Sequence, residues 1–315
     1  MFEILAPIFA LVALGYGCRR LRVLGPHAYV ELNHFVVALA LPALLFDIVA
    51  HVTLRQLDQP GFIASFGLGA LLVLAVPLLV GRRGRPFGDA ALDALTASYP
   101  NTGYIGLPLA VLAFGPASAP GAAIAVVFTT CVLFGIAIML LELDAHRGDD
   151  VGSTVLKVAR SLIRNPMIVA PICAIAFTAG WIPLPAAGDR LVKLLAGAAG
   201  PCALVSLGLF LASDDSTNAR PWAAAFRARP LALVALKLVV QPFVTAALAV
   251  FAFGLAPRDV ALVTILSALP TGTGAFMLAA YFNRDPEVTS AAILLSTLAS
   301  VLTLSICLAV FPALS

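Results

Sequence analysis

Long apolar runs alternate with short polar segments along the chain, and each run has the length of a membrane-spanning helix. About 20 mainly apolar residues, each rising ~1.5 Å, cross the hydrocarbon core of a bilayer. Ten runs meet this requirement: residues 2–18, 29–50, 61–81, 90–114, 119–141, 163–181, 188–212, 230–254, 258–282 and 287–312. The sequence lacks the alternating pattern of a membrane β-barrel. It predicts an all-α integral membrane protein with ten transmembrane helices.

Two of these runs contain a proline followed by small polar residues. The fourth run includes Pro100, Asn101, Thr102 and Gly103, and the ninth includes the stretch 270–274, Pro-Thr-Gly-Thr-Gly. Proline removes a backbone N–H and glycine tolerates non-helical angles, so both helices should break there. Lipid offers the freed backbone groups no partner, so both breaks should face protein or a water-filled cavity. A pair of broken spans in corresponding halves points to a transporter's binding site.

The chain divides into two halves of five runs each. We expect a first repeat at 1–141, a polar connection at 142–162 and a second repeat at 163–315. Residues 41–46 resemble residues 200–205, and the Pro100 region matches the Pro270 region. Because each half has an odd number of spans, the two repeats must run in opposite directions across the membrane, as in many secondary carriers.

Basic residues in the connections predict the orientation. One set of alternate connections holds fourteen Lys and Arg residues and the other holds four. The positive-inside rule places the first set in the cytoplasm, so both termini should face outward. The net charge of +3 is then a topology signal and no sign of nucleic-acid binding.

Composition agrees with this class of protein. Hydrophobic residues make up 61% of the chain and charged residues 11%, too little polar surface for a water-soluble globule of this length. The basic residues near the N-terminus follow the first apolar run, so we expect that run not to be a cleaved signal. The five cysteines lack metal-ligand spacing and favour neither zinc nor disulfides. No nucleotide, cofactor or catalytic motif is visible, so we expect a protein that is no enzyme and binds no cofactor or metal.

The two breaks predict an anion site. If the fourth and ninth helices cross near mid-membrane, the half-helices that begin after Pro100 and Pro270 aim their N–H groups at one point. A helix start carries about half a positive charge and suits a carboxylate. The predicted substrate-binding residues come from both breaks: Asn101, Thr102, Gly103, Thr271, Gly272 and Thr273.

Lys237 lies near the middle of the eighth run, where an ammonium needs a partner or water. Three roles stay open: counter-ion to an anionic substrate, titrating group in proton coupling, or partner of a carboxylate such as Asp93. Gln241, one turn on, shares its face. We assign this pair to charge tuning or coupling.

Other polar residues have simpler explanations. Asp89, Asp93 and Asp259 lie near the starts of the broken helices, where the helix dipole stabilises acids. Asn33 and His34 fall within the first turns of the second run, where a helix-end or core role is expected and a proton relay through His34 stays open.

These motifs resemble those of the auxin efflux carrier family, whose bacterial members include malonate and malate permeases. The resemblance covers all ten spans and rests on residues 100–108, 41–46 and 237–242. It implies a scaffold of helices 1, 2, 6 and 7, a transport domain of helices 3–5 and 8–10 with crossed helices 4 and 9, and an elevator-like movement, commonly in a homodimer. Asn101 matches the family's crossover asparagine, which contacts a substrate carboxylate. Thr271 replaces the asparagine of the plant pattern.

The sequence therefore predicts a secondary transporter of a small organic anion, a mono- or dicarboxylate such as malonate, in a bacterial inner membrane. H⁺ or Na⁺ is a candidate co-transported ion. Rival interpretations are a sodium-coupled carrier similar to the bile-acid symporters, and a channel or non-transporting sensor; an intramembrane enzyme is the weakest, because only Lys237 offers a buried ionisable group.

Overall fold

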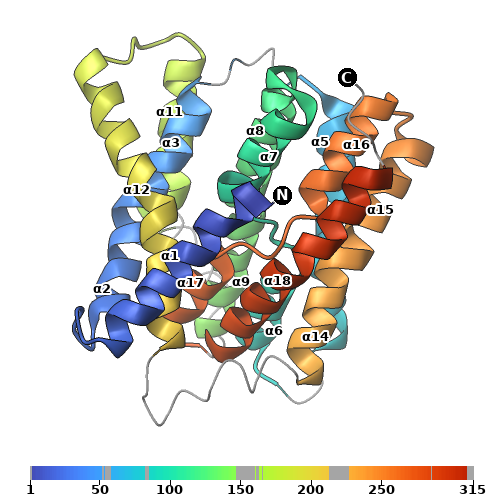
Figure 1. Cartoon of the computed structure of the whole chain (residues 1–315). Coiled ribbons are helices and arrows are strands. Elements are labelled where there is room, and N and C mark those ends of the chain that lie inside the picture. The colour runs from blue at the N-terminus through green and yellow to red at the C-terminus, as the bar shows by residue number, and fades with distance from the viewer. Residues whose placement is uncertain are drawn as a thin grey trace.

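The computed structural model describes residues 2–51, 53, 58–81, 85–146, 160, 163–164, 166–212, 227–284 and 286–310. Most of the expected connection 142–162 lies outside these residues. Within them every regular element is helical, and one isolated β-bridge is the sole ladder contact (Figure 1). The prediction of an all-α membrane protein is confirmed.

Six helices of the described chain are long and apolar enough to cross a membrane. They cover residues 28–51, 60–80, 116–145, 186–210, 228–252 and 286–310, and their ends lie within four residues of six predicted runs. Two further predicted runs are interrupted, as the sequence indicates. The remaining two correspond to α1 (Phe2–Arg20) and α11 (Pro166–Thr178).

Large apolar side chains cover much of the outside of the helices. Leu79, Leu194 and Phe251 are 74%, 76% and 87% exposed. Such side chains cost free energy in water, whereas lipid tails accommodate them. The apolar exterior is the one expected of a multi-pass membrane protein.

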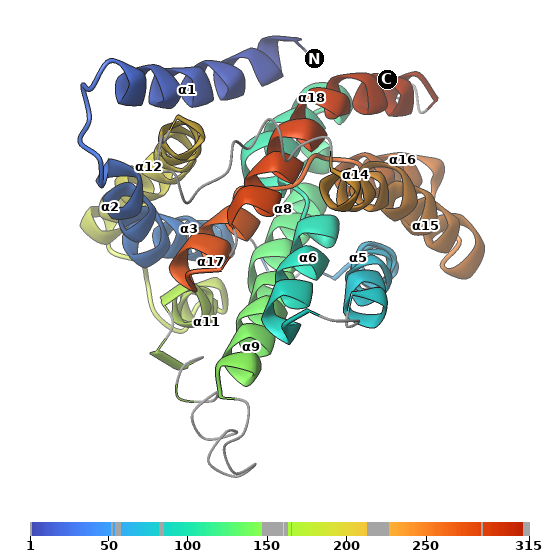
Figure 2. The same cartoon turned by 90° about the horizontal axis from the view of Figure 1, so that it is seen from below.

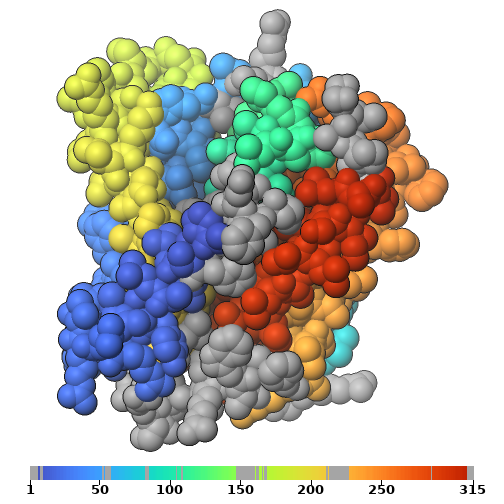
Figure 3. All heavy atoms as spheres, in the orientation of Figure 1, coloured from blue at the N-terminus to red at the C-terminus, as the bar shows by residue number. Residues whose placement is uncertain are grey.

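The helices form two spatial groups. The small helix group contains α1, α11, α12 (Ala186–Leu211) and one long helix made of α2 (Ala28–Phe35), the π-helical turn η1 (Val36–Ala40) and α3 (Leu41–His51). These elements lie together on one side of the molecule in both views (Figures 1 and 2). In the space-filling view, α1 lies on the surface beside α12 (Figure 3).

Glycines bring α1 and α12 together. A side chain at Gly15 would overlap the Val205 backbone, and one at Gly208 would overlap the carbonyl of Val12. Small residues of this kind let membrane helices approach until their backbones touch, which strengthens van der Waals packing. The contact explains why this pair stays together within the small helix group.

The large helix group contains all remaining elements, including both interrupted helices. Its members are α5 (Pro60–Val80), α6 (Phe87–Ser98), η2 (Thr102–Gly106), α7 (Leu107–Phe114), η3 (Pro116–Ser118), α8 (Ala119–Val127), η4 (Phe128–Leu133), α9 (Phe134–Ala145), α14 (Ala228–Ala235), η5 (Leu236–Val240), α15 (Gln241–Ala247), η6 (Leu248–Ala252), α16 (Pro257–Ser267), α17 (Gly274–Tyr281) and α18 (Pro286–Val310).

Three of the π-helical turns have an evident cause in the sequence. The turns η1, η2 and η5 each end two residues before a proline, at Pro42, Pro108 and Pro242. Proline cannot donate to the carbonyl four residues earlier, and a regular α-helix would crowd that carbonyl. A wider turn relieves the crowding without breaking the helix.

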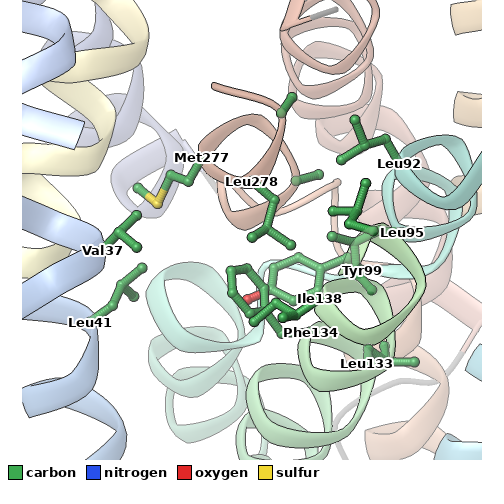
Figure 4. Close-up of a cluster of buried hydrophobic side chains, with 14 of the residues drawn as sticks. Val37, Leu41, Leu92, Leu95, Tyr99, Leu133, Phe134, Ile138, Met277 and Leu278 are labelled. Carbon is green, nitrogen blue, oxygen red and sulfur yellow. The ribbon is translucent and has the colours of Figure 1, made fainter. Parts of the chain in front are cut away.

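Apolar side chains fill the boundary between the two groups. Val37 and Leu41 of the small helix group share one buried cluster with Tyr99, Phe134 and Met277 of the large helix group (Figure 4). Dispersion contacts of this kind have little directional preference.

Candidate functional site

Both predicted interruptions are present in the structure. The helix α6 ends at Ser98, Tyr99 adopts an extended backbone conformation, and η2 begins at Thr102. In the second half α16 ends at Ser267 and α17 begins at Gly274. The first break thus separates α6 from η2, and the second separates α16 from α17.

The two interruptions pair with each other through their backbones. Pro100 and Thr271 form an antiparallel β-bridge. The N–H of Asn101 donates to the carbonyl of Pro270, and the N–H of Gly272 donates to the carbonyl of Tyr99, both at 2.9 Å. Residues 169 to 173 positions apart in the sequence thus satisfy backbone groups that lipid would leave unpaired.

Glycine is required at this crossing for space. A Cβ atom at Gly272 would lie 2.8 Å from the Tyr99 ring, and one at Gly274 would lie 2.9 Å from it. Tyr99 itself is buried and also packs on Phe134. The ring fits against the second interruption only because those two positions carry no side chain.

A small cavity of about 30 Å³ opens at the crossing, enough for one or two water molecules. The starts of both half-helices line it, together with side chains of α3, α8 and η4. The lining residues are Leu41, Leu44, Tyr99, Pro100, Asn101, Thr102, Gly103, Val126, Thr130, Gly272, Thr273 and Gly274. We call this cavity the crossover pocket.

Five of the six predicted binding residues line the crossover pocket: Asn101, Thr102, Gly103, Gly272 and Thr273. The hydroxyl of Thr102 is buried without a hydrogen-bond partner within the described chain. A buried hydroxyl without a partner costs free energy that a ligand oxygen would recover.

Thr271 occupies a different place from the one the sequence predicts. Its hydroxyl donates to the carbonyl of Thr96 at 3.0 Å, and its N–H donates to the hydroxyl of Ser296 at 3.1 Å. The side chain therefore secures the last turn of α6 and is not part of the pocket lining. Sequence alone could not distinguish Thr271 from Thr273, because both follow the same proline.

Lys237 and Gln241 hold the carboxyl ends of the two helices that stop at the crossing. The Nζ of Lys237 donates to the carbonyl of Ser267 at 2.6 Å, and the Nε2 of Gln241 donates to the carbonyl of Ser98 at 3.1 Å. Both side chains are fully buried, and neither lines the crossover pocket. In this arrangement Lys237 is no direct counter-ion to a ligand in the pocket.

Asp93 is not the partner of Lys237. Its carboxylate accepts two bonds from Arg229 Nε, one from Arg229 Nη2 and one from Arg85 Nη1, at 2.8 to 3.1 Å. Asp93 also lies beyond the first turn of α6, so two guanidinium groups meet its charge instead of the helix start. Asp89 and Asp259 do lie in first turns, as predicted.

Two arginines connect the ends of the interrupted helices. Arg284, just after α17, contacts Asp89 at the start of α6 at 3.2 Å and Asp144 at the end of α9 at 2.5 Å. Arg258, at the start of α16, donates to the carbonyl of Phe114 at 2.5 Å and so caps α7. Each interrupted helix thus begins beside the end of the other.

Leu41 and Leu44 are the lining residues that sequence reasoning missed on the small helix group. They belong to the segment 41–46, which we identified from sequence as a repeat motif and as a motif of the family resemblance, not as part of a binding site. Their hydrophobic character is shared with dozens of core residues, so the motif alone gave no signal for the pocket. His34 packs edge-on against Tyr281, while Asn33 is buried in α2; both lie outside the pocket.

A further polar cluster joins the end of α3 to the start of α12. His51 contacts Asp47 at 3.1 Å and Asp189 at 3.0 Å, and Lys193 contacts Asp189 at 2.8 Å. Three of these residues could approach one metal ion. The ammonium of Lys193 already balances one carboxylate, so we assign no metal there.

Comparison with known proteins identifies the family of this chain. A family model described as "Membrane transport protein" matches residues 1–308, nearly the whole length. The chain belongs to this transporter family. It is a family of transporters and not of enzymes, and the resemblance to the auxin efflux carriers is confirmed.

Three relatives match this chain over nearly the full length of both proteins. A protein of Rhizobium meliloti (strain 1021) named "Putative malonate transporter" is 30% identical over 303 residues, which are 95% of this chain and 92% of the relative. The "Auxin efflux carrier component 8" of Arabidopsis thaliana is 26% identical over 345 residues, 93% of this chain and 92% of the relative. The "Uncharacterized transporter YfdV" of Escherichia coli (strain K12) is 25% identical, covering 95% and 94%.

Proposed function

We propose that this transporter is a secondary carrier of a small organic anion, a mono- or dicarboxylate such as malonate, and that the crossover pocket binds the carboxylate. The observation that supports this proposal is the pairing of Pro100 with Thr271, which brings the starts of both half-helices to one cavity. The name of the Rhizobium relative supports malonate as the first substrate to test.

Charge supports a carboxylate as the ligand. A helix start carries about half an elementary positive charge, so two starts supply about one charge in total. One carboxylate balances that charge. The first turn of each half-helix offers N–H groups without intrahelical partners, and Asn101, Thr102 and Thr273 add side-chain donors.

The size of the pocket supports a moving carrier. A cavity of about 30 Å³ is smaller than a dicarboxylate, so binding requires the pocket to widen. Leu41 and Leu44 form its wall on the small helix group, and the other lining residues belong to the large helix group. A displacement of one group against the other would open it.

We propose an elevator mechanism on this basis. The small helix group corresponds to the scaffold of helices 1, 2, 6 and 7, and the large helix group to the transport domain of helices 3–5 and 8–10. The apolar boundary between the groups supports sliding as one body. The proposed architecture has ten spans in two inverted repeats, in which helices 4 and 9 cross. The repeats are residues 1–141 and 163–315, and the connection 142–162 joins them.

The proposed orientation keeps the basic ends in the cytoplasm. Arg85, Arg229 and Arg284 belong to the predicted cytoplasmic set, and all three pair with acids of the large helix group at its ends. Both chain termini then face outward, in a bacterial inner membrane. A homodimer is part of this proposal, and H⁺ and Na⁺ are its two alternative co-transported ions.

Energy limits the direction of transport. With a negative interior, each uncompensated negative charge imported costs about 2.3 kcal/mol per 100 mV. Uptake of a dianion therefore requires accompanying cations, whereas export does not. A sodium-coupled carrier differs from a simple carrier because its transport depends on external sodium. A channel differs because its flux does not saturate with substrate concentration.

Transport by Asn101→Ala tests the proposal. Asn101 contributes a hydrogen bond to a charged ligand, so its loss should lower malonate flux in proteoliposomes by about 10- to 100-fold. The measurement is uptake or efflux of radiolabelled malonate, with size-exclusion chromatography to show that the variant is folded.

Asn33→Ala is the matched control, because Asn33 is a buried asparagine outside the pocket. It should retain flux. Unchanged flux in Asn101→Ala would remove Asn101 from the site, and equal losses in both variants would show that the effect is not specific to the pocket.

A further inference from the structure

Lys237 places a buried amino group at a point where the described chain offers it no carboxylate. Its side chain is fully buried in η5, and its recorded partner is the backbone carbonyl of Ser267. No described acid forms an ion pair with it; Asp93, the candidate from sequence, is bound by Arg85 and Arg229. When this group is protonated, its charge must be balanced by something other than a carboxylate.

The carboxyl ends of α6 and α16 supply that balance. Each helix end carries about half an elementary negative charge, so the two ends together carry about one. Lys237 bonds to the last residue of α16, and Gln241, four residues on, bonds to the last residue of α6. One ammonium therefore matches the summed charge of the two ends.

Broken helices in secondary carriers commonly use these same ends to hold a coupling cation. Unwound carbonyls and the carboxyl ends of half-helices are the groups that coordinate Na⁺ in such proteins. Here the Ser267 carbonyl accepts a hydrogen bond from Lys237, whose amino group is part of the chain itself. The oxygen Oε1 of Gln241, the residue that bonds to the end of α6, is buried without a hydrogen-bond partner within the described chain.

We propose that the Lys237 ammonium is a tethered replacement for a co-transported metal cation, so that this carrier moves its anion without Na⁺. The inference rests on the proposed carboxylate transport. The positive helix starts face the substrate, whereas the negative helix ends face Lys237, and the fixed ammonium travels with the large helix group through the whole cycle.

Removing the ammonium should convert the carrier into one that needs a free cation. Lys237→Ala leaves a space beside the Ser267 carbonyl, and oxygen ligands are those that hard cations prefer. Na⁺ or methylammonium is small enough to enter that space. Lys237→Met fills it with an apolar side chain and provides the matched control.

The experiment measures radiolabelled malonate flux in proteoliposomes, in sodium buffer, in N-methylglucamine buffer and in N-methylglucamine buffer with methylammonium. The wild type should show equal flux in all three. Lys237→Ala should lose about tenfold or more in N-methylglucamine alone and recover part of it with Na⁺ or methylammonium, because the added cation balances the helix ends again. Lys237→Met should lose flux without recovery, and Lys237→Arg should remain active without sodium.

Several results would overturn the proposal. They are wild-type flux that requires Na⁺, Lys237→Ala flux equal to the wild type in N-methylglucamine, or folded Lys237→Ala that neither cation restores. If Lys237→Ala does not fold, wild-type flux in sodium buffer compared with N-methylglucamine buffer still tests the proposal. Wild-type protein that moves no carboxylate in any buffer would instead contradict the proposed function, so the two failures are distinguishable.

Discussion

At Gly272 and Gly274 the second interruption packs directly on the ring of Tyr99. A methyl group at Gly272 would approach that ring to 2.8 Å, closer than two carbon atoms can lie without strain. The same residue donates its N–H to the carbonyl of Tyr99. One glycine thus determines both the spacing and the hydrogen bonding of the crossing.

Gly272→Ala should therefore destabilise the crossing. Overpacking of a buried contact costs about 1–3 kcal/mol. We expect a lower melting temperature in detergent together with reduced malonate flux. Gly135→Ala is the control, because a Cβ there meets nothing within 4 Å and alanine favours the surrounding helix. A Gly272→Ala protein as stable and active as the wild type would show that the ring moves aside freely.

The residue scale is also where sequence reasoning was least complete. The Pro, Gly and polar residues of both breaks were visible, because their backbone chemistry is incompatible with a lipid-facing helix. The partner of Lys237 could not be predicted from sequence, because it is a backbone carbonyl thirty positions away and any residue could present one. The hydroxyl direction of Thr271 likewise depends on the pairing of the breaks.

At the scale of elements, charged side chains connect helices that the breaks would otherwise weaken. Asp93 of α6 is almost fully buried and is held by Arg229, in the first turn of α14, and by Arg85. A buried carboxylate is stable only when donors surround it. This pairing anchors α14, and with it Lys237, against the first interrupted helix.

Arg229→Gln tests this connection. The variant leaves Asp93 with Arg85 alone, and losing bonds to a buried charged group costs about 1–3 kcal/mol. We expect a lower melting temperature, partly restored by adding Asp93→Asn, which removes the charge that needs a partner. Arg190→Gln, at an exposed position of α12, should leave the melting temperature unchanged. Additive effects of the two substitutions would contradict a direct Arg229–Asp93 interaction.

At the scale of the whole molecule, the two helix groups meet along an apolar boundary. Val37 belongs to the small helix group and Met277 to the large helix group, and both lie in one buried cluster (Figure 4). The helix positions were predictable because apolar run length is read directly from sequence. The grouping was implied only by a family resemblance, because no local pattern specifies which spans pack together.

Cross-linking across that boundary tests the elevator proposal. In a protein freed of its five cysteines, Val37→Cys with Met277→Cys should lose malonate flux after treatment with a cleavable bifunctional thiol reagent and regain it on reduction. Val49→Cys with Thr178→Cys, which joins α3 to α11 within the small helix group, is the control and should stay active. Full flux in the cross-linked Val37–Met277 protein would contradict relative movement of the groups.

The central claim is that a carboxylate binds between the starts of the two half-helices. Solid-state NMR of protein labelled with ¹⁵N-glycine and saturated with carboxyl-¹³C malonate measures this contact directly, because Gly103 and Gly274, near the starts of the two half-helices, line the crossover pocket. An N–H bonded to a carboxylate oxygen places its nitrogen roughly 4 Å or less from the carboxyl carbon. We predict strong ¹³C–¹⁵N dephasing that Asn101→Ala weakens; bound malonate without glycine dephasing would contradict the claim.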